Sequence, residues 1–212
     1  RREGLVEQLV SDGAAPYAIP IGGSTAVGAL GYLVAFVELI EQCETLGVEP
    51  AAVVHTSSSG GTHAGLVAGR ALVQHLGHGR LAREGRLPEI LAIGVAKGVV
   101  AGHPDVATLA ADALALAGHP DVSVDPADVH VDARWMGDDY GLPTPEADDA
   151  IRWAARSGGW VLDRTYSGKG MAGVRGNAAE GRWPAGSDVV FVHTGGVPAV
   201  FTPDGVADTV TR

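Results

Sequence analysis

The chain has 212 residues, a formal net charge of −10, one cysteine and 46% hydrophobic residues. This length can form one domain with a sizeable core, and the apolar content excludes an intrinsically disordered chain. The acidic balance argues against a nucleic-acid or anionic-membrane surface. Because Cys43 is the single cysteine, the chain cannot form an internal disulfide framework or a cysteine-based zinc site.

The start of the chain gives two further expectations. No signal peptide follows Arg1, and no uninterrupted apolar stretch approaches the roughly 18 residues of a membrane-spanning helix, so we expect a cytoplasmic protein. Arg1 stands where an initiator methionine would stand, which predicts a fragment that begins inside a longer gene.

Helices and strands are expected to alternate along the chain. Apolar spacing and turn residues predict, in order, a helix over 28–46, a strand over 51–54, a helix over 62–76, a strand over 90–95, a helix over 104–117, strands over 122–124 and 129–131, a helix over 145–158, and strands over 160–162 and 189–192. Thr144 and Pro145 are typical of a helix start, and Gly47 and Gly118 of helix ends. This alternation predicts an α/β fold with a parallel sheet covered on both faces.

Three predicted strands end in small, polar, glycine-rich segments, over 55–62, 163–170 and 193–196. Ligands bind beyond the carboxyl ends of strands in open parallel sheets, so the three ends predict one shared site. In the first segment, hydroxyls and glycines lead into a helix whose N-terminal N–H groups favour a phosphate. The alternative is an ordinary strand-to-helix turn, and neither the nucleoside-triphosphate loop nor the dinucleotide fingerprint is present.

The other two segments carry weaker signals. Tyr166 and Ser167 suit acid–base or orienting roles, and Thr194 suits contact with a ligand ring, although each is also typical of a plain turn. His193 by itself is more typical of a buried structural histidine. His75 and His78 lack a third ligand, and the acidic pair over 138–139 is more typical of a solvated loop, so we expect no metal site.

Five motifs occur in a fixed order between Tyr17 and Phe201. They are Tyr-Ala-Ile-Pro-Ile-Gly-Gly-Ser at 17–24 with Gly-Ala-Leu-Gly-Tyr at 28–32, Ser-Ser-Gly-Gly-Thr-His-Ala-Gly-Leu at 58–66, Tyr-Gly-Leu-Pro-Thr-Pro-Glu at 140–146, Leu-Asp at 162–163 with Tyr-Ser-Gly-Lys-Gly-Met-Ala-Gly at 166–173, and His-Thr-Gly-Gly-Val-Pro-Ala at 193–199. Together they resemble the 1-aminocyclopropane-1-carboxylate deaminase/D-cysteine desulfhydrase family, which are pyridoxal-phosphate enzymes of the tryptophan-synthase-β fold type.

The resemblance implies the parallel-sheet cofactor domain of fold type II, truncated at the N-terminus. Residues 1–24 would be a remnant of the smaller domain, and 25–212 an incomplete large cofactor-binding domain. Tyr166 would be the catalytic residue beside the substrate–cofactor adduct. The residues implied to bind pyridoxal 5'-phosphate are Ser58, Ser59, Gly60, Gly61 and Thr62 at its phosphate, with Ser167 and Thr194 near its pyridine ring.

Ser167 and Thr194 resemble the desulfhydrase branch, because the deaminases carry Glu and typically Leu at these positions. A neutral hydroxyl near the ring nitrogen implies a weaker electron sink, which suffices when a thiolate leaves the β-carbon. The family's Schiff-base lysine lies in an upstream Gly-Asn-Lys-type motif that this chain lacks. The chain's lysines, Lys97 and Lys169, match neither that motif nor that role. The upstream Ser or Asn that helps to bind the substrate carboxylate is also missing, and the loop after Tyr140 is shorter than in relatives.

The sequence therefore predicts part of a D-cysteine-desulfhydrase-like lyase that converts a small amino acid to pyruvate, ammonia and hydrogen sulfide. A cyclopropane-carboxylate deaminase or cysteate-type lyase, or a non-catalytic phosphate-ligand-binding remnant, are the alternatives. We expect a homodimer in the complete enzyme and no nucleic-acid or membrane partner. Missing strands would leave unpaired sheet edges, so the fragment is expected to aggregate or to depend on a partner.

Overall fold

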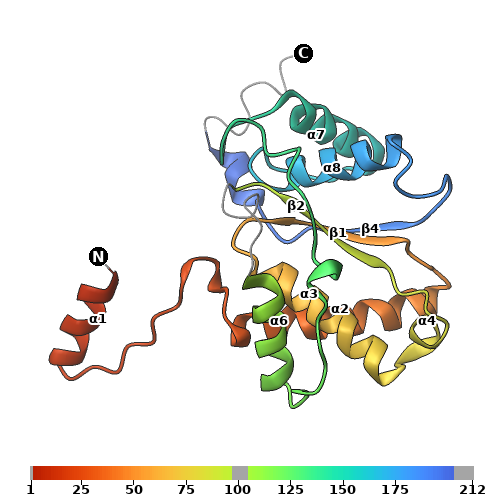
Figure 1. The fold of residues 1–212 in the computed structure, drawn as a ribbon. Helices are drawn as coiled ribbons and strands as arrows, with labels where there is room; N and C mark the ends of the chain where they lie inside the picture. The colour runs from red at the N-terminus through yellow and green to blue at the C-terminus, as the bar shows by residue number, and fades with distance from the viewer. Residues whose placement is uncertain (1, 97–104, 203–212) are drawn as a thin grey trace.

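A four-stranded parallel sheet lies at the centre of the computed structural model, which describes residues 2–96 and 105–202 (Figure 1). The strand order is β3-β2-β1-β4, and every pairing is parallel. The strands are β1 (Ala52–Ser57), β2 (Glu89–Gly94), β3 (His130–Asp132) and β4 (Val189–Val192). Their carboxyl ends therefore share one edge of the sheet.

Helices cover both faces of this sheet. In chain order, the helices of the described residues are α1 (Arg2–Ser11), α2 (Ala26–Leu46), α3 (Gly61–Leu76), α4 (Gly79–Arg83), α6 (Asp105–Leu116), α7 (Pro145–Gly158) and α8 (Ser167–Ala179). Short 3-10 turns occur at Ile21–Gly23, Pro126–Asp128 and Val197–Phe201. Helices α2, α3 and α6 lie on one side of the sheet and α7 and α8 on the other, whereas α1 stands apart from the body (Figure 1).

The core follows the two-residue alternation of the strands. Val53 and Ile90 face the side of α2, α3 and α6, and pack with buried residues such as Phe36. Val54 and Leu91 point to the other side, where they pack near Trp183. Both faces of each central strand are apolar, as expected for a parallel sheet between helical layers.

Most predicted elements are confirmed. The four expected helices correspond to α2, α3, α6 and α7, although Pro104 of the third lies outside the described residues. The strands expected over 51–54, 90–95, 129–131 and 189–192 correspond to β1, β2, β3 and β4. The α/β class with a parallel sheet covered on both faces is confirmed as well, whereas the domain division at residue 24 stays a prediction.

Two predicted strands are wrong. The segment 122–124 has no strand structure, because its valines pack against the core beside α6 instead of pairing at a sheet edge. The segment 160–162 also has no strand structure, and Trp160 and Val161 are about half exposed there. Helices α1, α4 and α8 were not predicted from the sequence.

Helix α2 is long and apolar enough, by length and composition, to cross a membrane. The sequence prediction required an uninterrupted apolar run, and Glu38 and Glu41 interrupt the apolar run within this helix. One face of α2 buries Leu33, Phe36 and Ile40 against the core, as the core helix of a globular domain does. This single helix therefore does not indicate a membrane protein.

Gly65 in α3 lies directly against the backbone of α2, where an added Cβ would collide with the carbonyl oxygen of Ala29. We expect Gly65→Ala to lower the free energy of unfolding by about 2 kcal/mol, because backbone atoms cannot rotate away. Gly31 in α2 is the matched control, since its surroundings are open. Gly31→Ala should raise stability by about 0.8 kcal/mol through helix propensity. Urea unfolding measures both, and a neutral Gly65→Ala would contradict this close packing.

Candidate functional site

The loop between β1 and α3 forms the first side of the candidate site. Gly60, with φ of 87°, turns the chain so that α3 begins at Gly61 with its N-terminus at the carboxyl edge of the sheet. Ser58, Ser59 and Thr62 are half-buried in this turn. The arrangement matches the predicted anion loop, and the role of Ser58, Ser59, Gly60, Gly61 and Thr62 in cofactor binding stays a prediction.

A second loop, over 21–25, packs against this turn. An added Cβ on Gly22 would overlap the side chain of Ser59, and one on Gly61 would lie 3.0 Å from Oγ of Ser24. Ser24 Oγ is buried and has no hydrogen-bond partner, which is rare for a hydroxyl. A hydroxyl donor without a partner beside a helix N-terminus fits a phosphate oxygen. Ser24 was not predicted as a site residue. The Gly-Gly-Ser sequence before a helix is the signal that could have identified it.

The segment before α8 forms the second side of the site, and Asp163 organises it. The buried Asp163 carboxylate accepts hydrogen bonds from the backbone N–H groups of Thr165, Tyr166 and Ser167, each at 2.8 Å, and from Oγ of Ser167 at 2.6 Å. Ser167 Oγ in turn accepts from the Asp163 N–H at 2.8 Å. The hydroxyl of Ser167, predicted near the cofactor ring, is therefore engaged with Asp163 in this structure.

Direct contacts bring the three predicted segments together. Thr56 Oγ1, near the end of β1, donates to the carbonyl oxygen of Tyr166 at 3.2 Å. Gly196 lies so close to Asp163 that an added Cβ would overlap its carboxylate. The predicted convergence of segments 55–62, 163–170 and 193–196 is therefore observed. Thr194 itself is exposed.

His193 departs from its predicted environment. The sequence analysis favours a buried structural histidine, whereas the ring is exposed and its Nε2 lies 2.9 Å from the carbonyl oxygen of Val161. The difference arises because His193 follows β4 at the edge of the sheet, where one flank of the strand is open.

Tyr140 lies against Tyr166, a pairing that the sequence analysis does not predict. Their rings meet edge to face with centroids 5.9 Å apart, and their hydroxyl groups are in hydrogen-bond contact. Burial, together with the hydrogen bond and charge of Tyr140, raises the pKa of Tyr166 to about 12. Tyr166 is a neutral phenol near pH 7, and its raised pKa makes it a weak acid that can donate a hydrogen bond.

Lys169 is fully buried in the first turn of α8. Its Nζ donates to the carbonyl oxygen of Met136 at 2.6 Å, in the loop that leads to Tyr140. Burial lowers the pKa of its ammonium group. The lysine thus holds a loop in place, while Lys97 lies outside the described residues.

Two buried histidines lie behind the anion loop. His55 on β1 and His63 on α3 approach through Nε2 and Nδ1 at 3.0 Å, and His55 Nδ1 lies 3.1 Å from the carbonyl oxygen of Thr56. Because a carbonyl only accepts, His55 Nδ1–H donates to it, and His63 Nδ1–H then donates to His55 Nε2. His63 Nε2 is left as a buried acceptor without a partner.

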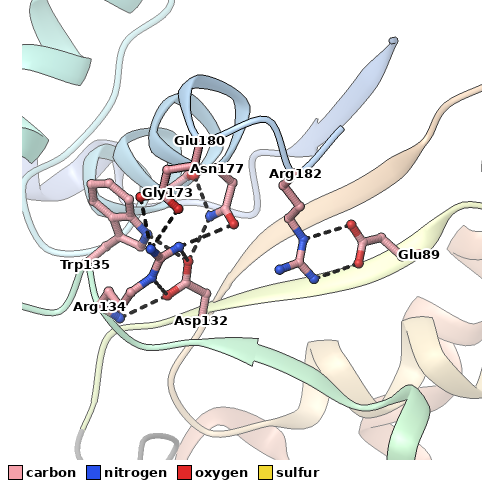
Figure 2. Close-up of polar contacts among 8 residues, drawn as sticks. All are labelled: Glu89, Asp132, Arg134, Trp135, Gly173, Asn177, Glu180 and Arg182. Atoms are coloured by element: carbon pink, nitrogen blue, oxygen red, sulfur yellow. Dashed lines mark hydrogen bonds and ion pairs between the residues drawn. The ribbon is translucent and has the colours of Figure 1, made fainter. Parts of the chain in front are cut away.

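A separate polar cluster fixes α8 to the sheet on the β3 side. Figure 2 shows the carboxylate of Asp132 among Arg134, Trp135 and Asn177, with bonds of 2.8–2.9 Å from their side chains. Although burial opposes it, hydrogen bonds from Arg134, Asn177 and Trp135 hold the pKa of Asp132 well below its usual range. Arg134 also pairs with Glu180. Across the ranges 2–96 and 105–202, no group of three or more His, Cys, Asp or Glu residues is placed to bind a metal.

Comparison with known proteins decides the family. The model of the pyridoxal-phosphate dependent enzyme family matches residues 1–195. The chain belongs to this family. D-cysteine desulfhydrases of Salmonella typhi and of Salmonella newport strain SL254 are each 35% identical over 199 residues, which cover 93% of this chain and 55% of each relative.

One solved structure has the same fold as this chain. The crystal structure described as an ACC deaminase homologue superposes with a TM-score of 0.75 at 30% identity, and covers 94% of this chain and 55% of that one. The chain thus spans about half the length of the relatives it matches. The predicted family, fold class and pyridoxal-phosphate dependence of the family are confirmed, and the end at which length is missing stays a prediction.

The buried histidine pair makes stability depend on pH. Burial lowers the pKa of His55 to about 4, and burial, then His55 and His130, lower that of His63. The unfolded chain binds these protons near pH 6.5, so stability is complete above that pH and is lost as pH falls toward 4. We expect urea unfolding to show a loss of about 2 kcal/mol between pH 7.5 and 5.5. His119→Gln should leave this slope unchanged, and a flat profile would contradict the neutral pair.

Because the Asp163 carboxylate accepts several hydrogen bonds, we expect its removal to lower the free energy of unfolding strongly. Asp163→Ala leaves buried N–H groups of the Tyr166 turn unpaired and should lower the free energy of unfolding by about 3 kcal/mol. Asp138→Ala, in an exposed loop, is the control and should change stability by less than about 0.5 kcal/mol. Denaturant unfolding followed by circular dichroism compares the two, and equal effects would sink this interpretation.

Proposed function

We propose that this chain forms the phosphate-binding side and the tyrosine face of a pyridoxal-phosphate-dependent lyase of the D-cysteine desulfhydrase type. The observation that carries the proposal is the meeting of three turns beside the N-terminus of α3, joined by the Thr56–Tyr166 hydrogen bond and the Asp163–Gly196 contact. Family membership and the relatives named D-cysteine desulfhydrase support it.

The phosphate side has donors of the right kind. The first N–H groups of α3 have no partner inside the helix and carry the positive end of its dipole. The buried hydroxyl of Ser24 adds a donor that lacks a partner, and the half-buried hydroxyls of Ser58, Ser59 and Thr62 line the same turn. These residues therefore fit a doubly charged phosphate ester.

The tyrosine face supplies a proton donor. When bound, pyridoxal phosphate withdraws electrons from the Cα of an amino acid. Tyr166 is a neutral phenol at pH 7, its pKa raised to about 12 favours donation of a hydrogen bond over loss of the proton, and Tyr140 orients its hydroxyl. In the proposal, Tyr166 donates a hydrogen bond to the sulfur that leaves the β-carbon with its electron pair, and water completes the conversion of cysteine to pyruvate, ammonia and hydrogen sulfide.

We propose that the amine that binds the cofactor comes from polypeptide outside this chain, since Lys169 is the only lysine among residues 2–96 and 105–202. Lys169 is engaged with the Met136 carbonyl and is fully buried, so it is a poor candidate for covalent attachment of the cofactor. The 55% coverage of relatives supports a source in the remaining length. A homodimer and a cytoplasmic location remain part of this proposal.

Two alternatives keep the family or the fold. A 1-aminocyclopropane-1-carboxylate deaminase or cysteate-type activity would use the same turns, and the likeness to the ACC deaminase homologue supports the first. A non-catalytic phosphate-ligand-binding protein would use the anion loop alone.

Cofactor binding tests the phosphate side. Calorimetry of the purified chain should show pyridoxal phosphate binding at least tenfold more tightly than pyridoxal, because only the ester reaches the α3 N-terminus. Ser24→Ala should weaken pyridoxal phosphate about tenfold by removing one hydrogen bond to a charged group. Ser157→Ala, on the exposed end of α7, should change neither affinity. Equal binding of the two compounds would refute the phosphate site.

Activity and covalent attachment test the missing amine. The chain mixed with pyridoxal phosphate and D-cysteine should release little sulfide, and borohydride reduction should leave no cofactor linked to Lys169. Brisk sulfide release would overturn the claim that the amine lies elsewhere. A panel of D-cysteine, L-cysteine, cysteate and the cyclopropane amino acid, tested on an enzyme extended to the length of its relatives, separates the alternatives.

A further inference from the structure

Lys169 joins two parts of the candidate site that are far apart in the sequence. It lies in the first turn of α8, close behind Tyr166, and its side chain is fully buried. Its Nζ donates a hydrogen bond to the carbonyl oxygen of Met136 at 2.6 Å and another to that of Asp139 at 3.5 Å. Both carbonyl groups belong to the loop that precedes α7 and carries Tyr140. Helix α8 therefore follows one tyrosine of the site and reaches the loop of the other through a single side chain.

The loop over 137–140 is exposed and forms neither helix nor strand, so its contacts with a rigid element decide where it lies. Its internal hydrogen bonds are local. The N–H of Tyr140 donates to Oδ1 of Asp139 at 2.8 Å, and the N–H of Leu142 donates to the carbonyl oxygen of Asp139 at 3.4 Å. Such bonds shape a turn but do not set its position relative to α8. The bonds from Lys169 do set that position.

The amine of Lys169 is costly to bury, which indicates that its donors are needed. A fully buried amine gives up its hydration, and burial lowers the pKa of this group although the charges of Asp139 and Asp163 oppose that shift. A methionine side chain of similar length would fill the same space without this cost. What methionine lacks is a donor for the Met136 carbonyl.

We propose that Lys169 is a positioning residue for the tyrosine pair, Tyr140 and Tyr166: its hydrogen bonds to the loop place the Tyr140 hydroxyl against that of Tyr166. The two rings meet edge to face with centroids 5.9 Å apart, and their hydroxyl groups are in contact. The role of the pair in the reaction rests on the proposed function, in which Tyr166 contacts the leaving sulfur. Lys169 then acts on that step only through Tyr140.

The proposal predicts the direction in which the acidity of Tyr166 changes. Burial, the hydrogen bond and charge of Tyr140, and the charge of Asp163 raise the pKa of Tyr166 to about 12. If loss of Lys169 displaces Tyr140, the pKa of Tyr166 falls, because one of these causes is removed. Loss of a nearby cation by itself would instead raise that pKa, since a cation stabilises the phenolate. Removal of Lys169 therefore distinguishes a positioning role from a purely electrostatic one.

Lys169→Met in the complete chain, without cofactor, tests this role. We expect the pKa of Tyr166 to fall from about 12 to about 11, so that the phenolate fraction at pH 10 rises about ninefold. NMR of 13C-labelled tyrosine measures the fraction, and the nuclear Overhauser effect between the two rings should disappear. Tyr140→Phe should raise the phenolate fraction equally, and the double variant should raise it no further, because both changes remove the same contact.

Arg175→Met is the matched control, because it removes one positive charge from an exposed position on the same helix. It should leave the phenolate fraction and the contact between the rings unchanged. Circular dichroism at pH 10 verifies that each variant is folded. If Lys169→Met does not fold, Lys169→Gln takes its place with the same expectation, since its shorter side chain cannot reach the loop.

A phenolate fraction of Tyr166 that is unchanged or lower in the Lys169 variant would overturn the proposal. Equal effects in Arg175→Met, or additive effects in the double variant with Tyr140→Phe, would also overturn it. Calorimetry with pyridoxal phosphate decides the proposed function separately. The expected titration without cofactor binding would reject the proposed function and keep the positioning of the tyrosine pair, whereas tight binding with an unchanged titration would reject only the role of Lys169.

Discussion

The candidate site depends on how the Asp163 carboxylate is satisfied. A buried carboxylate needs donors, and the donors within reach are the N–H groups that open α8 and the hydroxyl of Ser167. Meeting that need fixes the backbone of the turn that carries Tyr166, and Gly196 packs directly against the carboxylate. One buried charge thus sets the relative positions of two of the three turns, and Thr56 ties the third to them.

Close packing of α8 on the sheet provides the second constraint. An added Cβ at Gly170 would overlap Thr56 of β1, and at Gly173 it would overlap Ile93 of β2. Glycines at these positions bring the helix axis close to β1 and β2, so that Tyr166 reaches the carboxyl edge of the sheet. The polar cluster around Asp132 anchors the far end of α8 (Figure 2). The helix therefore lies along the sheet with both ends fixed.

The edge of the sheet at β4 and the proposed source of the cofactor amine both concern the length of the relatives that this chain does not span. An edge strand leaves backbone N–H and C=O groups unpaired on one flank, and a cofactor bound as a Schiff base requires a free amine. The chain spans 55% of its relatives and supplies the anion loop and the tyrosines. In the proposed function, the remaining length supplies the amine.

The sequence alone determined the elements whose signals are local. Apolar periodicity and caps gave α2, α3 and α7, and runs of β-branched residues gave β1 and β4, because these signals reside within a dozen neighbouring residues. The strand ends also indicated the three turns, and their motifs indicated the family. The buried hydroxyl of Ser24 and the contact of Tyr140 with Tyr166 were not predicted, because the motifs that contain these residues do not specify which distant residues they contact.

Only the tertiary structure decided α8, the fate of the segment 160–162, and the surroundings of His193. Glycine has a low intrinsic helix propensity, so the glycine-rich sequence over 167–176 resembles a loop. Only the tertiary structure shows that these glycines allow a helix to pack closely on the sheet. Strand propensity in 160–162 is real but needs a neighbour to pair with, and hydrogen bonds between strands are not encoded within one strand. Local preference therefore specifies elements, while contacts between distant residues decide which preferences are realised.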